Sequence, residues 1–145
     1  MVGGQVLDLQ ADGRIAGVRP SDERGLESIH RRKTGALIRS ALRLGVYAAG
    51  RRETAAIDRF AEAFGLLFQV TDDLLDATGS AEQAGKKTGK DSARGKLTYP
   101  GLLGIDASRE KARQLARDAV LAAESFGERG RVLAELANYV VQRDR

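Results

Sequence analysis

The sequence predicts an all-α protein. Its 145 residues include only two prolines, Pro20 and Pro100, and the long segments between glycines are rich in Ala, Leu, Arg and Glu. These residues favour helices. Apolar side chains also recur at helical spacing, most clearly from Glu53 to Asp76. With 42% hydrophobic and 30% charged residues, the chain is expected to form one globular unit over residues 1–145.

Start and stop signals divide the chain into predicted helices. Ser21 can cap the first long helix, and Gly79 is the expected end of the second. The long helices are predicted over about 21–49, 53–76, 108–126 and 131–143. Gly3 and Gly4 make residues 2–10 a poor independent helix start. Residues 79–96 alternate glycines with cations and are predicted to form a basic loop.

Composition excludes several classes of protein. The chain has no cysteine, which rules out disulfides, a thiolate nucleophile and cysteine-bound metals and permits a reducing compartment. No apolar run approaches the roughly 18 residues of a membrane span, and no secretory signal is visible at the start. A cytoplasmic protein is therefore expected. The net charge of +4 favours anionic partners without requiring nucleic acid.

The strongest candidate for a functional site is an acidic cluster in the second long helix. Gln69, Asp72, Asp73 and Asp76 fall within an arc of roughly 100° on a helical wheel. We expect that face to present the three carboxylates together, opposite an apolar stripe. Magnesium prefers such oxygen ligands and shares its remaining positions with water and substrate phosphates. The alternative is a solvated acidic helix end, and the spacing alone does not decide between the two.

Lys33 interrupts an apolar stripe formed by Leu26, Ile29, Leu37 and Leu44. A desolvated ammonium group needs an anion, so Lys33 is expected either to meet one or to extend its flexible stem to water. The neighbouring hydroxyl of Thr34 can add a hydrogen bond to a phosphate. The helical context excludes a Walker loop.

The basic loop follows the acidic cluster directly. Its cations Lys86, Lys90 and Lys96 can hold a polyanion already bound to metal. A basic loop in isolation is more often a solvated loop, but the position beside the acidic cluster favours the binding role. The loop has neither interleaved aromatic residues nor a nucleic-acid motif, so no nucleic-acid partner is expected. His30, the only histidine, carries no predicted role.

Five strings, taken in order, resemble the C-terminal half of bacterial farnesyl and geranylgeranyl diphosphate synthases of the polyprenyl synthetase family. They are residues 3–9 (GGQVLDL), 29–37 (IHRRKTGAL), 68–76 (FQVTDDLLD), 85–86 (GK) and 95–100 (GKLTYP). The resemblance implies a helical bundle of the isoprenoid synthase type, of which residues 1–145 would form the C-terminal portion.

The same resemblance implies residue roles. Asp72, Asp73 and Asp76 would bind magnesium and substrate diphosphate, with Asp72, Asp73, Gln69 and Lys33 taking part in catalysis. The diphosphate-binding residues would be Lys33, Thr34, Lys86, Lys96, Gln5 and Asp8. The implied substrates are isopentenyl diphosphate and an allylic diphosphate, and the implied full-length enzyme is a homodimer.

The family's first aspartate-rich motif has no counterpart in this sequence. Catalysis by the chain alone is therefore not expected, and the product length cannot be distinguished, because the residues that limit chain growth in the family lie near that motif. A non-catalytic helical partner that retains the acidic cluster is the alternative function.

Overall fold

The computed structural model describes residues 1–17, 19–52, 54–82 and 96–143, and every regular element in these ranges is helical. The α-helices are α1 (Val2–Ala11), α2 (Glu23–His30), α3 (Ala36–Ala48), α4 (Ala55–Glu82), α5 (Tyr99–Leu103), α6 (Ile105–Glu124) and α7 (Arg131–Gln142). A π-helical turn, Arg31–Gly35, joins α2 to α3, and a 3-10 turn, Gly127–Gly130, joins α6 to α7. The predicted all-α class is confirmed.

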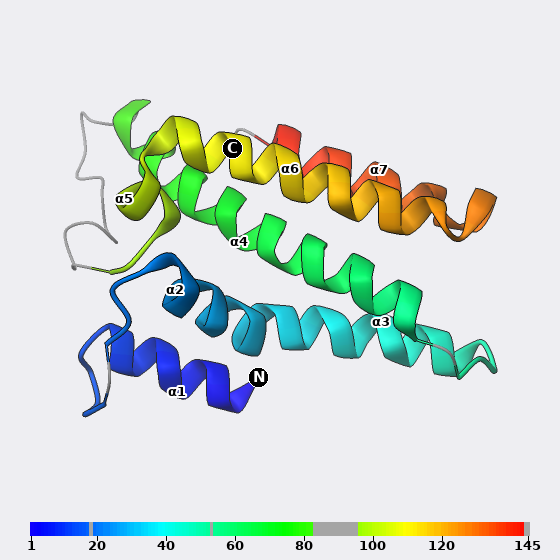
Figure 1. Cartoon of the computed structure of the whole chain (residues 1–145), viewed down its shortest axis with the longest axis horizontal. Helices are drawn as coiled ribbons and strands as arrows, with labels where there is room; N and C mark the ends of the chain where they lie inside the picture. The colour runs from blue at the N-terminus through cyan, green and yellow to red at the C-terminus, as the bar shows by residue number, and fades with distance from the viewer. Residues whose placement is uncertain (18, 53, 83–95, 144–145) are drawn as a thin grey trace.

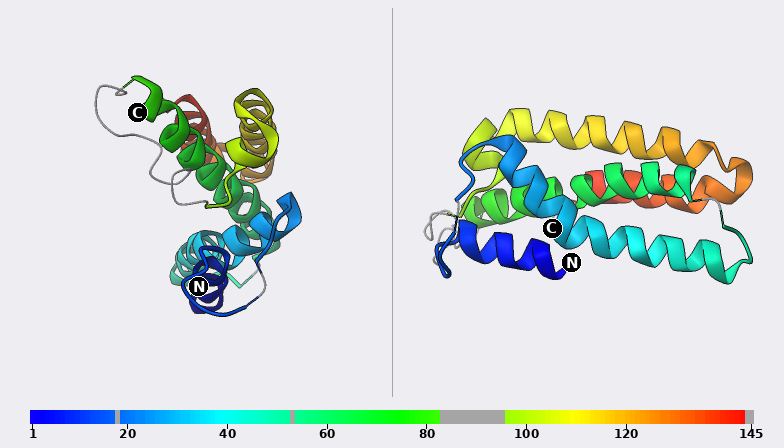
Figure 2. Two further views of the ribbon diagram at one scale, coloured as in Figure 1. Left: turned by 90° about the vertical axis from the view of Figure 1, so that its left-hand side faces the viewer. Right: turned by 60° about the horizontal axis from the view of Figure 1, so that its bottom comes forward.

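The longest helix, α4, runs through the middle of the molecule (Figure 1), with α6 and α7 on one side and the rod formed by α2, the π turn and α3 on the other. Helix α1 lies outermost and packs along α2 and the π turn, as Figure 2 also shows. None of the described helices combines the length and the apolarity needed to cross a bilayer.

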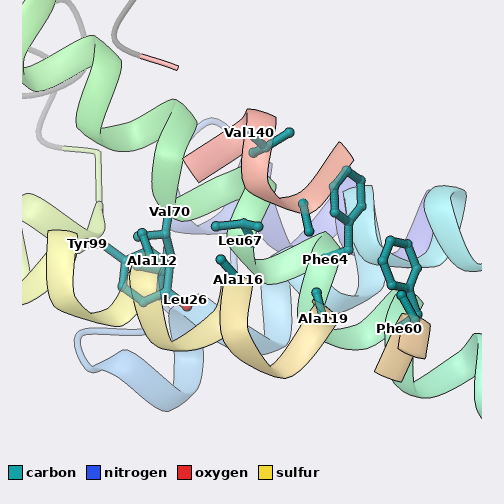
Figure 3. Close-up of a cluster of buried hydrophobic side chains, with 12 residues drawn as sticks. Leu26, Phe60, Phe64, Leu67, Val70, Tyr99, Ala112, Ala116, Ala119 and Val140 are labelled. Carbon is teal, nitrogen blue, oxygen red and sulfur yellow. The ribbon is translucent and has the colours of Figure 1, made fainter. Parts of the chain in front are cut away.

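The core lies where α4 meets α6 and α7 (Figure 3). Helix α6 turns small residues toward α4, at a spacing of four, three and four positions that keeps them on one helical face. These residues are Ala112, Ala116, Ala119 and Ala123. Their short side chains let the larger residues of α4, among them Phe60, Leu67 and Val70, pack closely against the backbone of α6.

Two predicted helix boundaries are wrong. The cap of α2 is Asp22 rather than Ser21, because the Asp22 carboxylate accepts a hydrogen bond from the Gly25 N–H at 2.8 Å. Helix α4 does not end at Gly79 but continues to Glu82. An interior glycine costs a helix only about 1 kcal/mol, and this long, packed helix tolerates it.

Helix α5 lies in a stretch where no helix is predicted. Thr98 caps it by accepting a hydrogen bond from the Gly101 N–H at 3.2 Å, and Pro100 occupies its first turn. Gly104, at φ 84°, separates α5 from α6. Helix α6 consequently begins at Ile105, three residues before the predicted start.

The predicted apolar stripe around Lys33 is only partly correct. Leu26 and Ile29 of α2 are buried in the core, whereas Leu37 and Leu44 of α3 are 54% and 67% exposed. The helical wheel assumes a regular α-helix from end to end. The π turn breaks that regularity, so α2 and α3 do not continue one common face.

Candidate functional site

Helix α1 lies against the π turn because Gly4 has no side chain. A β-carbon at this position would lie 2.3 Å from both the Arg32 carbonyl carbon and the Lys33 backbone nitrogen. One turn further along α1, Asp8 lies on the same face and pairs with the Lys33 ammonium group. The glycines that make this segment a poor isolated helix thus permit the contact that holds it in place.

Helix α4 approaches the π turn from the opposite side. A β-carbon on Gly65 would lie 3.1 Å from the Cα of Gly35, so the two backbones touch through paired glycines. The turn that carries Lys33 and Thr34 is therefore held between two helices. Lys33 was expected to meet an anion or to reach water. It meets Asp8, and its side chain remains 32% exposed.

His30 ends α2 and lies beside the predicted site residue Asp73, although no role was predicted for it. Burial lowers its pKa to about 4, and the positive charges of Lys96 and Lys33 act in the same direction, while Asp8 and Gln69 oppose them. These four residues come from α1, the π turn, α4 and the segment that precedes α5. Four of the predicted site residues therefore influence the pKa of His30.

Asp73 is buried beside His30, with 7% of its surface exposed. One carboxylate oxygen, Oδ2, accepts a hydrogen bond from the Tyr99 N–H at 3.0 Å and lies 4.0 Å from Nε2 of His30. The Tyr99 ring is fully buried and stacks on the His30 ring, with the centroids 5.7 Å apart. Burial raises the pKa of the Tyr99 hydroxyl, so the phenol remains neutral.

Asp72 and Asp76 are exposed, unlike Asp73. Asp72 pairs with Arg143 at 3.5 Å, and the Arg143 guanidinium lies 5.5 Å from the centroid of the Phe68 ring. The helical wheel predicted that the three carboxylates would be presented together. They are not, because Asp73 lies at the edge of the arc where α4 meets α5. Among the described residues, no three acidic, histidine or cysteine side chains are close enough to hold a metal ion by themselves.

The remaining predicted site residues differ in burial. Gln5 is exposed on α1, and Thr34 is partly buried in the π turn. Lys96 is partly buried and acts electrostatically on His30. Lys86 and Lys90 lie outside the described residues. Tyr99, which the sequence analysis missed, could have been found from Thr98, Pro100 and Gly104, since these residues mark a short helix that starts beside it.

A cavity of about 480 Å³ opens between α1, the π turn and α4. Arg31, Arg32, Arg39 and Glu62 line it, and Arg31 pairs with Glu62 across it. None of the predicted site residues that the structure describes lines this cavity, so its position does not coincide with the acidic face of α4.

Comparison with known proteins gives consistent matches. Residues 1–137 match the family described as polyprenyl synthetase. Farnesyl diphosphate synthase of Escherichia coli (strain K12) is 46% identical over 151 residues, which covers 100% of this chain and 49% of that protein. The chloroplastic geranylgeranyl pyrophosphate synthase of Catharanthus roseus is 44% identical, with 99% of this chain and 40% of that protein covered.

Solved structures agree with these matches. A farnesyl-diphosphate synthase structure from Marinomonas sp. MED121 superposes with a TM-score of 0.77 at 32% identity, covering 98% of this chain and 46% of that one. The Helicobacter pylori geranyltransferase, solved with magnesium and isoprenyl diphosphate, gives a TM-score of 0.73 at 29% identity, with 97% and 45% covered. The chain thus spans about half the length of the relatives it matches.

Proposed function

Because the chain belongs to the polyprenyl synthetase family, we propose that it supplies the C-terminal half of a trans-prenyltransferase site. This site joins isopentenyl diphosphate to an allylic diphosphate. The proposal is supported by the contact of Asp73 on α4 with His30 and Tyr99, because His30 directly precedes the π turn that carries Lys33 and Tyr99 follows Lys96 by three residues. Such a grouping suits a polyanion accompanied by a divalent cation.

In this proposal, Asp72 and Asp76 bind magnesium. They are exposed one turn apart on α4, where carboxylate oxygens can be reached from solvent. Two carboxylates suit magnesium, which keeps several waters and completes its shell with substrate phosphates. Bound there, magnesium would neutralise charge on the diphosphate. Asp73 belongs to the same predicted set, but its buried position sets it apart.

The residues of this chain would act on the departing diphosphate. When the allylic C–O bond breaks, the diphosphate keeps the electron pair, and the double bond of isopentenyl diphosphate then forms the new C–C bond before a proton is lost. Lys33 and Lys96 would stabilise the charge that builds up on the diphosphate, most strongly in the transition state. Thr34 would donate a hydrogen bond, and Lys86 and Gln5 belong to the same proposal by resemblance.

The alternative is a helical partner without catalytic activity. Exposed apolar side chains on α1 and α3 favour it, because large apolar surfaces usually mark contacts. They are Val2, Val6, Leu37, Leu44 and Tyr47. Both functions need further helices to complete a fold of which this chain spans about half.

The deciding experiment measures incorporation of radiolabelled isopentenyl diphosphate with geranyl diphosphate and magnesium. The 145-residue chain is assayed alone and after co-expression with the first half of the E. coli enzyme, whose second half it resembles at 46% identity. We expect little turnover alone and restored turnover with the added half. A stable but inactive complex would favour the helical partner, and comparable turnover by the chain alone would show that the added half is unnecessary.

A further inference from the structure

The three aspartates of α4 occupy different environments. Asp72 and Asp76 face solvent, whereas Asp73 is buried and has an oxygen 3.0 Å from the Tyr99 nitrogen. Tyr99 is the first residue of α5, and the first N–H groups of a helix have no partner within the helix. Asp73 supplies that partner. The negative charge of its carboxylate also suits the positive end of the helix.

This hydrogen bond, which uses Oδ2, would be lost if the Asp73 carboxylate rotated out of its buried position toward the exposed face of α4. Tyr99 is fully buried, so its N–H would lose this acceptor and could not replace it with water. An orphaned buried donor carries a substantial free-energy penalty, so the carboxylate is held where it lies. Neither Asp72 nor Asp76 is buried in this way.

The contact also determines where two cations lie. Lys96 precedes Tyr99 by three residues, and the backbone between them is extended at Thr98, with φ −136° and ψ 158°. The Tyr99 ring stacks on His30, which directly precedes the π turn that carries Lys33. Asp73 thus connects the acidic face of α4 to both cation-bearing segments through one residue, Tyr99.

We propose that Asp73 is a positioning residue and not a metal ligand: it holds the start of α5, and through Tyr99 it holds Lys96 and Lys33 opposite Asp72 and Asp76. The inference rests on the proposed function, since it assigns different tasks within the same site. The two tasks need different chemistry. A positioning residue needs an acceptor oxygen, which asparagine also has, whereas a magnesium ligand needs a carboxylate charge.

The test uses alanine and asparagine at two positions. Asp73→Ala, Asp73→Asn, Asp72→Ala and Asp72→Asn are each titrated with magnesium and pyrophosphate by calorimetry. We expect Asp73→Ala to weaken pyrophosphate binding by about tenfold, because the cations lose their position. Asp73→Asn should restore binding to within about twofold of the unsubstituted chain. Both Asp72 variants should lose binding alike, because neither carries the charge.

Amide hydrogen exchange gives a second readout that needs no metal. Asp73→Ala should speed exchange at the Tyr99 amide by roughly tenfold or more, Asp73→Asn should leave it slow, and Asp72→Ala should not change it. Equal loss of binding in Asp73→Asn and Asp72→Asn, with Tyr99 still protected, would identify Asp73 as a ligand and overturn the inference. Unchanged exchange in Asp73→Ala would overturn it as well. If the unsubstituted chain binds no magnesium–pyrophosphate, the proposed function fails, and exchange at Tyr99 still decides whether Asp73 holds α5.

Discussion

Gly4 of α1 lies against the backbone of Lys33, so close that a methyl group would stand 2.3 Å from the Lys33 nitrogen. Gly4→Ala should therefore push α1 away from the π turn and separate Asp8 from Lys33. We expect a loss of about 1–3 kcal/mol in the free energy of unfolding, as for other overpacked sites. Urea denaturation measures it.

Gly3→Ala is the matched control, because no atom lies within 4 Å of a β-carbon at that position. It makes the same change in helix propensity, which favours alanine by up to about 1 kcal/mol. We expect Gly3→Ala to leave stability unchanged or raised. Equal destabilisation by both substitutions would mean that close approach at Gly4 does not hold α1.

Arg43 and Asp58 join α3 to α4 through two parallel hydrogen bonds, each of 2.7 Å. Both side chains are partly exposed, so a double-mutant cycle with alanine should give only a small favourable coupling. The exposed pair Arg113 and Glu110, within α6, should give less. A coupling no larger than that of this control pair would contradict the view that Arg43 and Asp58 stabilise the contact between α3 and α4.

The Arg43–Asp58 pair should also be sensitive to acid. The hydrogen bond from Arg43 holds the pKa of Asp58 below its usual value. The unfolded chain therefore takes up this proton at higher pH than the folded chain does. The stabilisation is present above the ordinary pKa of aspartate and is lost as the pH falls through the lowered one. Denaturation of Asp58→Asn across pH 3–5 should show a smaller dependence on pH.

Protonation of His30 should make the free energy of unfolding depend on pH, over a higher pH range than the one in which Asp58 acts. Its pKa is about 4 in the folded chain, whereas an exposed histidine has an ordinary pKa of 6.5. The unfolded chain therefore binds more protons between these values, and stability should fall as the pH drops from 6.5 toward 4. The full effect is about 3 kcal/mol. His30→Phe keeps a ring that can stack on Tyr99 and should remove this part of the slope. Parallel curves for both proteins would show that His30 does not titrate as described.

Lys33 should contribute more to diphosphate binding than an ordinary surface cation. Lys33→Ala is expected to weaken magnesium–pyrophosphate binding by about 1.5–3 kcal/mol, the range for a hydrogen bond to a charged group. Arg113→Ala removes the same charge from an exposed position on α6 and should have little effect. Calorimetry compares the two. Equal losses would favour general electrostatic attraction over a specific contact.

The sequence predicted those features that depend on local pattern. The helical spacing of Phe60, Phe64 and Leu67 located α4, because amphipathic periodicity follows directly from helix geometry. Lys33 was expected either to meet an anion or to reach water, since a buried ammonium group without a partner is costly, and it pairs with Asp8. The site residues Gln69, Lys33 and Lys96 were chosen from spacing and resemblance, and all three influence the pKa of His30.

Features that depend on contacts between distant segments could not be predicted. A helical wheel gives the direction of Asp73 but not the helix α5 that covers it. The π turn depends on neighbours of Gly35, among them Gly65, thirty residues further along the chain. The exposure of Leu37 and Leu44 was missed because a stripe of leucines indicates a buried face without indicating what buries it.

The π turn gives the α2–α3 rod an unusual response to changes in chain length. A π turn holds one residue more than an α turn, and each residue of an α-helix turns it by about 100°. Deleting a single residue within Arg31–Gly35 would thus convert the π turn into an α turn and leave α2 and α3 close to their present relative orientation, whereas the same deletion elsewhere in the rod would rotate one part by about 100° against the other. Arg43 could still reach Asp58, and His30 would still face Tyr99. The extra residue therefore widens the turn that carries Lys33 without changing the phase of the two helices, and the rod should tolerate a one-residue deletion there better than at any other position.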